Sequence, residues 1–165
     1  MKTISFFGHR QIFNNNIIKS RLIEKLKEYI PQGYSKTLIG CHGDFDNLSL
    51  SACLDIKNNF FPFLDVSVVL TSLSFLNKNK NGYSKADYYK NKGCNILFYN
   101  IEEVYFKNTI SFSNKKMVDE SNLIICYVDM RSSFSGAKNA VLYAIKKKKL
   151  IINLFNEEDR KIIHL

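Results

Sequence analysis

Short apolar runs alternate with longer amphipathic stretches along this chain. The runs are rich in Ile, Val and aromatic residues, and nearly continuous apolar runs of this length are typical of strands buried on both faces of a parallel sheet. We therefore expect six strands. They are Thr3–Phe7, Thr37–Gly40, Val66–Leu70, Asn95–Tyr99, Leu123–Val128 and Leu150–Leu154.

Helical periodicity fills several of the intervals between these runs. Between the first two, apolar residues from Ile17 to Ile30 recur every three or four positions among charged ones, as in an amphipathic helix. Further helices are predicted from Phe45 to Lys57, from Lys115 to Glu120 and from Ala137 to Lys147. Strands that alternate with helices predict βαβ crossovers. We expect an α/β fold: a single Rossmann-like domain over residues 1–165, with a doubly wound, mostly parallel sheet and helices on both faces.

Composition adds a size class and a cellular setting. A chain of 165 residues with 45% hydrophobic content is long enough to bury one substantial core. The first apolar run is too short for a signal peptide, and no later run has membrane-spanning length, so we expect a cytoplasmic protein with no membrane partner. The four cysteines, Cys41, Cys53, Cys94 and Cys126, show neither C-x-x-C nor zinc-site spacing, which predicts reduced thiols.

The charge of the chain points to anionic partners without selecting one. Lys and Arg number 24 against 15 Asp and Glu, for a formal net charge of +9, which attracts nucleotides, nucleic acids or acidic surfaces. Much of the excess is lysine, at 78–92 and 146–149, whereas arginine is the usual reader of base edges and phosphate. Nucleic acid is therefore an allowed but not a favoured partner, and a coding bias toward Lys, Asn and Ile explains the excess equally well.

A polar, turn-rich stretch at 77–83 follows the third predicted strand. A loop at that place in an α/β sheet reaches toward the ligand crevice, so it could serve as a lid. Surface decoration is the alternative, and the sequence favours it.

Two loops carry the chemistry that the sequence offers at the predicted strand ends. Gly8, His9 and Arg10 directly follow the first strand, and ligands of open α/β sheets bind where the strands end. Arg10 could hold a phosphate or carboxylate through two parallel hydrogen bonds, and His9 could donate to a ribose or a leaving group. A solvated turn is the alternative for this His-Arg pair.

The second loop, which follows the second strand, is acidic. Its residues His42, Gly43, Asp44 and Asp46 open a predicted helix, and two carboxylates there would repel a phosphate. We therefore expect this loop to bind hydroxyls or a base, or to supply a general base; alternatively, one aspartate caps the helix. Together with His9 these residues could also suggest a metal site, but they lack the fixed spacing of metal ligands, so we expect no metal and no cofactor.

A third loop suits an anion better. Ser135, Gly136 and Lys138 open the helix predicted from Ala137, and no carboxylate occurs between Asp129 and Glu157. Exposed backbone N–H groups and the helix dipole attract phosphate at such a start, and an N-cap serine is compatible with that role. Sequence patterns of P-loops, dinucleotide-binding fingerprints and nucleophile elbows are absent.

These loops together resemble those of a known superfamily. The segments are Phe6-Phe7-Gly8-His9-Arg10, Gly40-Cys41-His42-Gly43-Asp44-Phe45-Asp46, Met117-Val118-Asp119, Ser135-Gly136-Ala137 and Ile151-Ile152-Asn153-Leu154. The chain is similar over nearly its whole length to the YpsA-like branch of the SLOG superfamily of Rossmann-like proteins, which also includes the LOG phosphoribohydrolases and the DNA-processing protein DprA. The resemblance implies binding of a nucleotide or an ADP-ribose-like ligand in the crevice between the loops.

The same resemblance leaves catalysis open. LOG enzymes carry a glycine-rich run that ends in a catalytic glutamate, whereas the matching stretch here begins Ser135-Gly136-Ala137 and contains no acid. An arginine expected before Met117 is also replaced, by Ser113. We therefore expect a sensor or sequestering protein, with homo-oligomerisation undecided. The alternatives are a hydrolase of N-glycosidic or phosphate bonds that uses Asp44, Asp46 or Asp119 as general base, and, less favoured, a nucleic-acid-binding protein.

Overall fold

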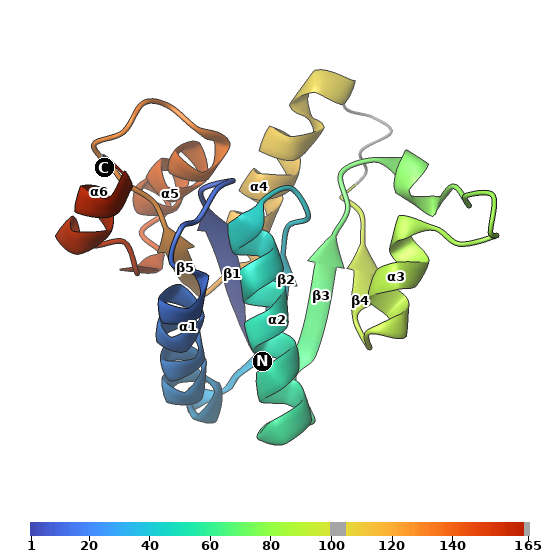
Figure 1. Ribbon diagram of the computed structural model, residues 1–165, viewed down its shortest axis with the longest axis horizontal. Helices are drawn as coiled ribbons and strands as arrows, with labels where there is room; N and C mark the ends of the chain where they lie inside the picture. The colour runs from blue at the N-terminus through green and yellow to red at the C-terminus, as the bar shows by residue number, and fades with distance from the viewer. Residues whose placement is uncertain (100–104, 164–165) are drawn as a thin grey trace.

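Six parallel strands form one sheet in the order β4-β3-β2-β1-β5-β6 (Figure 1). The structure is a computed structural model, and it describes residues 1–99 and 105–163. The strands are β1 (Lys2–Gly8), β2 (Tyr34–Ile39), β3 (Asp65–Val69), β4 (Asn95–Leu97), β5 (Leu123–Tyr127) and β6 (Leu150–Asn153). The six predicted strands are confirmed, and the sheet is parallel throughout rather than mostly so.

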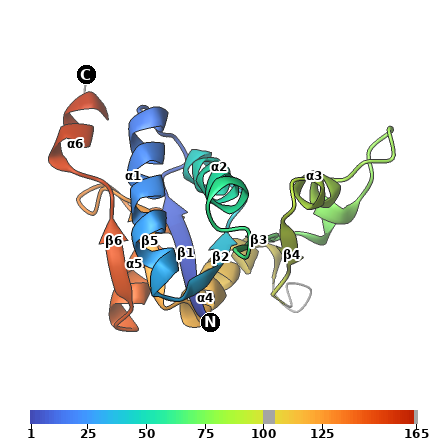
Figure 2. The same cartoon turned by 90° about the horizontal axis from the view of Figure 1, so that it is seen from below.

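Helices cover both faces of this sheet, which confirms the predicted doubly wound α/β fold (Figure 2). One face carries α1 (Asn15–Tyr29), α2 (Asp44–Asn59) and α3 (Lys85–Asn91), with α6 (Glu157–Ile163) beside α1. The other face carries α4 (Thr109–Glu120) and α5 (Gly136–Lys146). In the described part of the chain, the short 3-10 turns η1 (Ile30–Gln32), η2 (Leu73–Leu76) and η4 (Phe106–Asn108) lie in the connections.

The two layers of helices create two apolar clusters, one on each face of the sheet. On the first face, Ile18, Leu22 and Leu26 of α1 and the fully buried Phe45 of α2 pack against the sheet. On the second face, the apolar sides of α4 and α5 pack against the same strands. Alternate residues of each strand supply the two clusters, because side chains of a strand point to opposite faces.

The order of the strands creates a crevice beside β1. The chain builds β1, β2, β3 and β4 outward in one direction and then returns to add β5 and β6 on the other side of β1 (Figure 1). Ile4 accordingly lies opposite Thr37 of β2 on one side and Leu123 of β5 on the other. Loops that leave β1 and β5 diverge to opposite faces, and this reversal is the place where open α/β sheets bind ligands.

Several helical segments differ from the predicted ones. Helix α4 begins at Thr109, six residues before the predicted Lys115, and α3 and α6 were not expected at all. Helix α3 has seven residues, and its start depends on a capping box in which Ser84 and Asp87 exchange hydrogen bonds. Such short helices are stabilised by caps and packing rather than by a repeating pattern.

No helix among the described residues is both long and apolar enough to cross a membrane. The four cysteines are free thiols, and all but the half-buried Cys41 are buried.

Candidate functional site

A cavity of about 390 Å³ lies at the carboxyl edge of the sheet, beside the reversal in strand order. The ends of β1, β2 and β3 form its floor, and its walls are formed by the first turns of α2 and α5 and by residues 110–117 of α4. Most of the predicted binding residues line it. They are Gly8, His9, Arg10, His42, Gly43, Asp46, Ser135 and Gly136.

Arg10 is the cation that this cavity presents. Its carbonyl accepts a hydrogen bond from the Asp44 N–H at 2.9 Å, and a Cβ on Gly43 would lie 2.9 Å from the Arg10 Cα. The β1–α1 and β2–α2 loops therefore touch through their backbones, which fixes where the Arg10 side chain starts. Its guanidinium is exposed and forms no hydrogen bond or ion pair with the described residues, so it is available to an anionic ligand.

His9 lines the cavity but is held by the protein. Its Nε2 accepts a hydrogen bond from the Asp129 N–H at 2.8 Å, so the neutral ring carries its proton on Nδ1. Burial lowers the pKa of His9, and the nearby Asp129 carboxylate opposes that effect only in part. Arg160 in turn binds Asp129, with its Nε 3.0 Å from Oδ2. The ring thus joins the loops after β1 and β5, and within the described residues its Nδ1–H has no hydrogen-bond partner.

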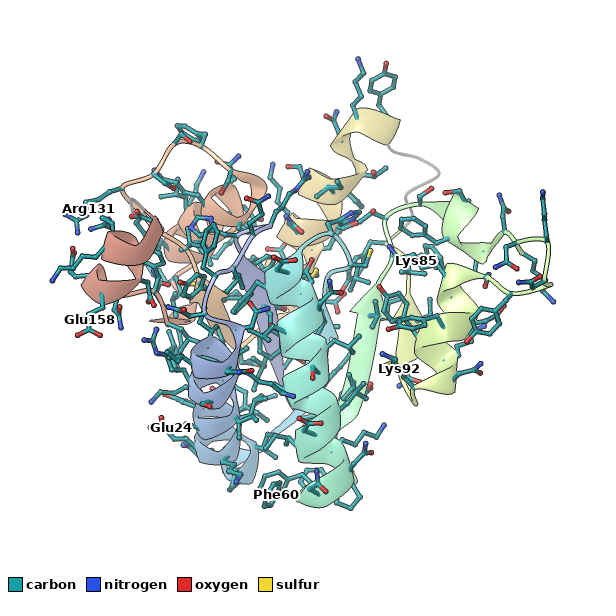
Figure 3. All side chains as sticks on the ribbon, in the orientation of Figure 1. Glu24, Phe60, Lys85, Lys92, Arg131 and Glu158 are labelled. Atoms are coloured by element: carbon teal, nitrogen blue, oxygen red, sulfur yellow. The ribbon has the colours of Figure 1, made fainter. Side chains whose placement is uncertain are left out.

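His42, in the β2–α2 loop, and Asp46, in the first turn of α2, supply hydrogen-bonding groups to the cavity. His42 Nε2 lies 2.7 Å from Thr71 Oγ1 at the end of β3, and burial, with smaller effects of the Lys85 and Arg10 charges, lowers the pKa of the ring. Lys85, labelled at the start of α3 in Figure 3, donates to the Cys41 carbonyl at 3.3 Å. This side of the cavity therefore presents a neutral imidazole, and Lys85, which does not line the cavity, is anchored to the loop before it.

Asp46 stabilises the turn before α2 and also has a raised pKa. Its Oδ2 accepts from the His42 N–H at 2.8 Å, so the carboxylate holds the turn between β2 and α2. Burial raises the pKa of Asp46, against the opposing effects of the His42 and Gly43 N–H groups and of Arg10. A carboxyl group with a raised pKa that lines a cavity has the properties of a general acid or base.

The other two candidate acids and one candidate cation do not reach the cavity. Asp44 instead accepts from the Ile12 N–H at 3.1 Å and ties down the β1–α1 loop. Asp119 lies at the far end of α4, where it accepts from the Tyr143 hydroxyl at 3.0 Å. The Lys138 ammonium donates to the Ser132 carbonyl at 2.7 Å and closes its own loop. Asp44 and Lys138 thus support the loops of the site without lining it.

The start of α5 offers an acid-free approach for an anion. Ser135 is the N-cap, and its hydroxyl accepts from the Lys138 N–H at 3.1 Å. The first turn contains no acid. A Cβ on Gly136 would find only Asn114 Nδ2, at 4.0 Å, so the space beside this glycine is open toward α4.

One wall of the cavity was missed by sequence reasoning. Ile110, Ser113, Asn114 and Met117 of α4 all line the cavity. Their spacing of i, i+3, i+4 and i+7 places them on one face of a helix, but the two central members are polar and weaken the apolar periodicity. Thr71, after β3, also lines the cavity and was not predicted. Asn77–Tyr83 does not line it, because Asn79 folds that loop on itself through bonds to the Asn81 and Tyr83 N–H groups.

Comparison with known proteins assigns no family. No protein-family model matches the chain, and no curated protein matches it. Within residues 1–99 and 105–163, no group of three or more His, Cys, Asp or Glu side chains could hold a metal ion.

Proposed function

We propose that this protein binds a nucleotide-derived small molecule, a nucleotide or an ADP-ribose-like compound, and acts as a sensor or sequestering protein. The observation that carries the proposal is one cavity bordered by two anion-attracting groups, the Arg10 guanidinium, which forms no hydrogen bond or ion pair with the described residues, and the acid-free start of α5. Guanidinium forks and helix starts are the common phosphate ligands of proteins. The resemblance of these loops to the SLOG superfamily supports the same ligand class.

The rest of the cavity suits the non-phosphate part of such a ligand. The neutral ring of His42 and the Asp46 carboxyl group can bond to hydroxyls or to a base edge. The volume of about 390 Å³ lies near the lower end of the range of about 300–1,000 Å³ for small-molecule sites. A mononucleotide-sized group therefore fits better than an entire dinucleotide, whose second half would extend into solvent.

Calorimetric titration with AMP, ADP-ribose, NAD and cyclic ADP-ribose tests this function. We expect at least one of them to bind, and Arg10→Gln to weaken it by roughly 1.5–3 kcal/mol, the value of a hydrogen bond to a charged group. Lys146→Gln is the matched control, because it removes one positive charge from the exposed far end of α5. Equal effects of the two substitutions would mean that net charge, and not the cavity, attracts the ligand. Failure of all four compounds to bind would refute the proposal.

A hydrolase is the second candidate function, and the position and raised pKa of Asp46 favour it. Asp46 lines the cavity and has a raised pKa, whereas residues 130–156 contain no carboxylate to act as the LOG-type acid. Incubation with the same four compounds followed by chromatography separates the two functions. We expect the ligand to be recovered intact; free base or ribose phosphate at multiple turnovers, abolished by Asp46→Asn, would establish the enzyme instead.

A further inference from the structure

The wall formed by α4 contains a polar group without a partner. Ser113 is 1% exposed, and its hydroxyl has no hydrogen-bond partner among the described residues. It lines the cavity beside Asn114. A buried hydroxyl left without a partner costs roughly 1–3 kcal/mol, and a serine in a helix can avoid that cost by bonding to the carbonyl four residues earlier. Ser113 does not do so.

The neighbours of Ser113 define which chemical group could satisfy it. No described cation faces it from its own helix, because the Lys115 and Lys116 ammonium groups lie over the rings of Tyr143 and Phe112. The flanking cavity residues on α4, Ile110 and Met117, are apolar. A phosphate would find no countercharge on this wall, whereas a neutral hydroxyl can both donate to and accept from a serine.

The position of Asn114 places that hydroxyl close to the anion. A Cβ on Gly136, at the start of α5, would lie 4.0 Å from Asn114 Nδ2, and Ser113 is the next residue of α4. If the phosphate of a ligand lies at the start of α5, the ligand atoms next to that phosphate lie near Asn114 and then near Ser113. In a nucleotide, the group joined to the phosphate is the sugar.

We propose that Ser113 is a specificity-determining residue that hydrogen-bonds to a ribose hydroxyl of the ligand, with Asn114 bridging the sugar and the phosphate. The inference rests on the proposed function and assigns one contact within it. It predicts that the protein distinguishes ribonucleotides from deoxynucleotides through α4, and not only through the His42 and Asp46 side of the cavity.

The chain supplies a matched control for this residue. Ser49 of α2 is 0% exposed and is the other buried serine, among the described residues, whose hydroxyl has no partner, but it does not line the cavity. Ser113→Ala and Ser49→Ala remove the same atom from equally buried helical positions. Both variants should unfold at or slightly above the wild-type temperature, since each loses an unsatisfied polar group.

The test is a calorimetric cycle with AMP, 2′-deoxy-AMP and 3′-deoxy-AMP. We expect wild-type protein and Ser49→Ala to bind AMP about five-fold more tightly than one deoxy analogue, the range of a neutral hydrogen bond. Ser113→Ala should bind AMP about five-fold more weakly and bind that analogue as tightly as AMP. If Ser113→Ala keeps the wild-type affinity or the wild-type discrimination, the inference is wrong while the proposed function stands. If AMP does not bind to wild-type protein, the inference is wrong as well, and the four-compound titration above then decides the proposed function.

Discussion

Gly8 is required by helix packing, and replacing it tests how tightly the site is built. A Cβ at Gly8 would lie 2.3 Å from Cγ and 2.5 Å from Cβ of Phe45, where ordinary contacts begin at 3.4 Å. Phe45 is fully buried and stacks on Tyr127 with ring centroids 6.1 Å apart. Because the Phe45 Cβ is itself too close, no side-chain rotation relieves the clash, and the start of α2 must move away from β1.

The cost of Gly8→Ala follows from that displacement. Gly8 does not have a positive φ, so the penalty is steric and not a backbone preference. Overpacking a tight core costs about 1–3 kcal/mol, and occasionally more, and a backbone displacement belongs at the upper end. For a domain of this size each kcal/mol lowers the unfolding temperature by about 2–4 °C, so we expect a decrease of roughly 5–12 °C.

Thermal unfolding followed by circular dichroism measures this decrease. Gly136→Ala is the control, because a Cβ there meets only one atom, at 4.0 Å, and its backbone φ is not positive. We expect its unfolding temperature to remain within about 2 °C of wild type, as for an exposed substitution worth less than about 0.5 kcal/mol. If Gly8→Ala had the same unfolding temperature as Gly136→Ala, α2 would not approach β1 as described.

Three further outcomes are expected. Gly136→Val should fold normally but weaken AMP by at least about ten-fold in calorimetry, because its methyl groups fill the space where one charged hydrogen bond would form; unchanged affinity would remove the start of α5 from the site. Asp46→Asn should weaken binding by roughly 1–3 kcal/mol, because Asp46 lines the cavity. Asp44→Asn should bind as wild type, since Asp44 accepts from the Ile12 N–H and does not line the cavity; the opposite order would reverse their roles. Burial lowers the pKa of His42 below its ordinary value, so the unfolded chain binds more protons at this group than the folded chain does. The free energy of unfolding therefore falls as the pH drops through about 6.5, by at most about 1.4 kcal/mol per pH unit. His42→Gln should reduce that slope in thermal unfolding between pH 7.5 and 5.5, and an unaltered slope would contradict the assignment.

The strands could be predicted because burial on both faces leaves a direct mark on the sequence. Residues Leu123 to Tyr127 of β5 are all buried, and all five are apolar in the sequence, as expected for a strand buried on both faces. Helix α1 was predictable for a related reason, since its buried Ile18, Leu22 and Leu26 keep the helical spacing. The loops of the site could be placed because parallel strands all end at one edge of the sheet.

The missed parts of the site have physical reasons as well. The first turns of α4 escaped prediction because Ser113 and Asn114 occupy positions of its inner face that a core helix fills with apolar residues. The two aspartates of the acidic loop could not be separated by pattern, because they lie only two residues apart, yet one carboxylate reaches the cavity and the other reaches the Ile12 N–H. Lys138 lies in sequence beside the turn that we predicted to bind an anion, but its ammonium donates to a nearby carbonyl.

The reversal of strand order beside β1 has a consequence for biosynthesis. Strand β1 emerges first from the ribosome and can pair with β2 early, but its other edge waits for β5; the Thr3 N–H, for instance, donates to Asn122 Oδ1, 119 residues later. Until then the central strand of the sheet is an open edge, which invites pairing with other chains. The walls from α4 and α5 are equally absent from a nascent chain, so a small molecule cannot protect it by binding. If the proposed ligand binds, we expect it to raise the yield of completed protein only, because the cavity is complete only after α4 and α5 have been added.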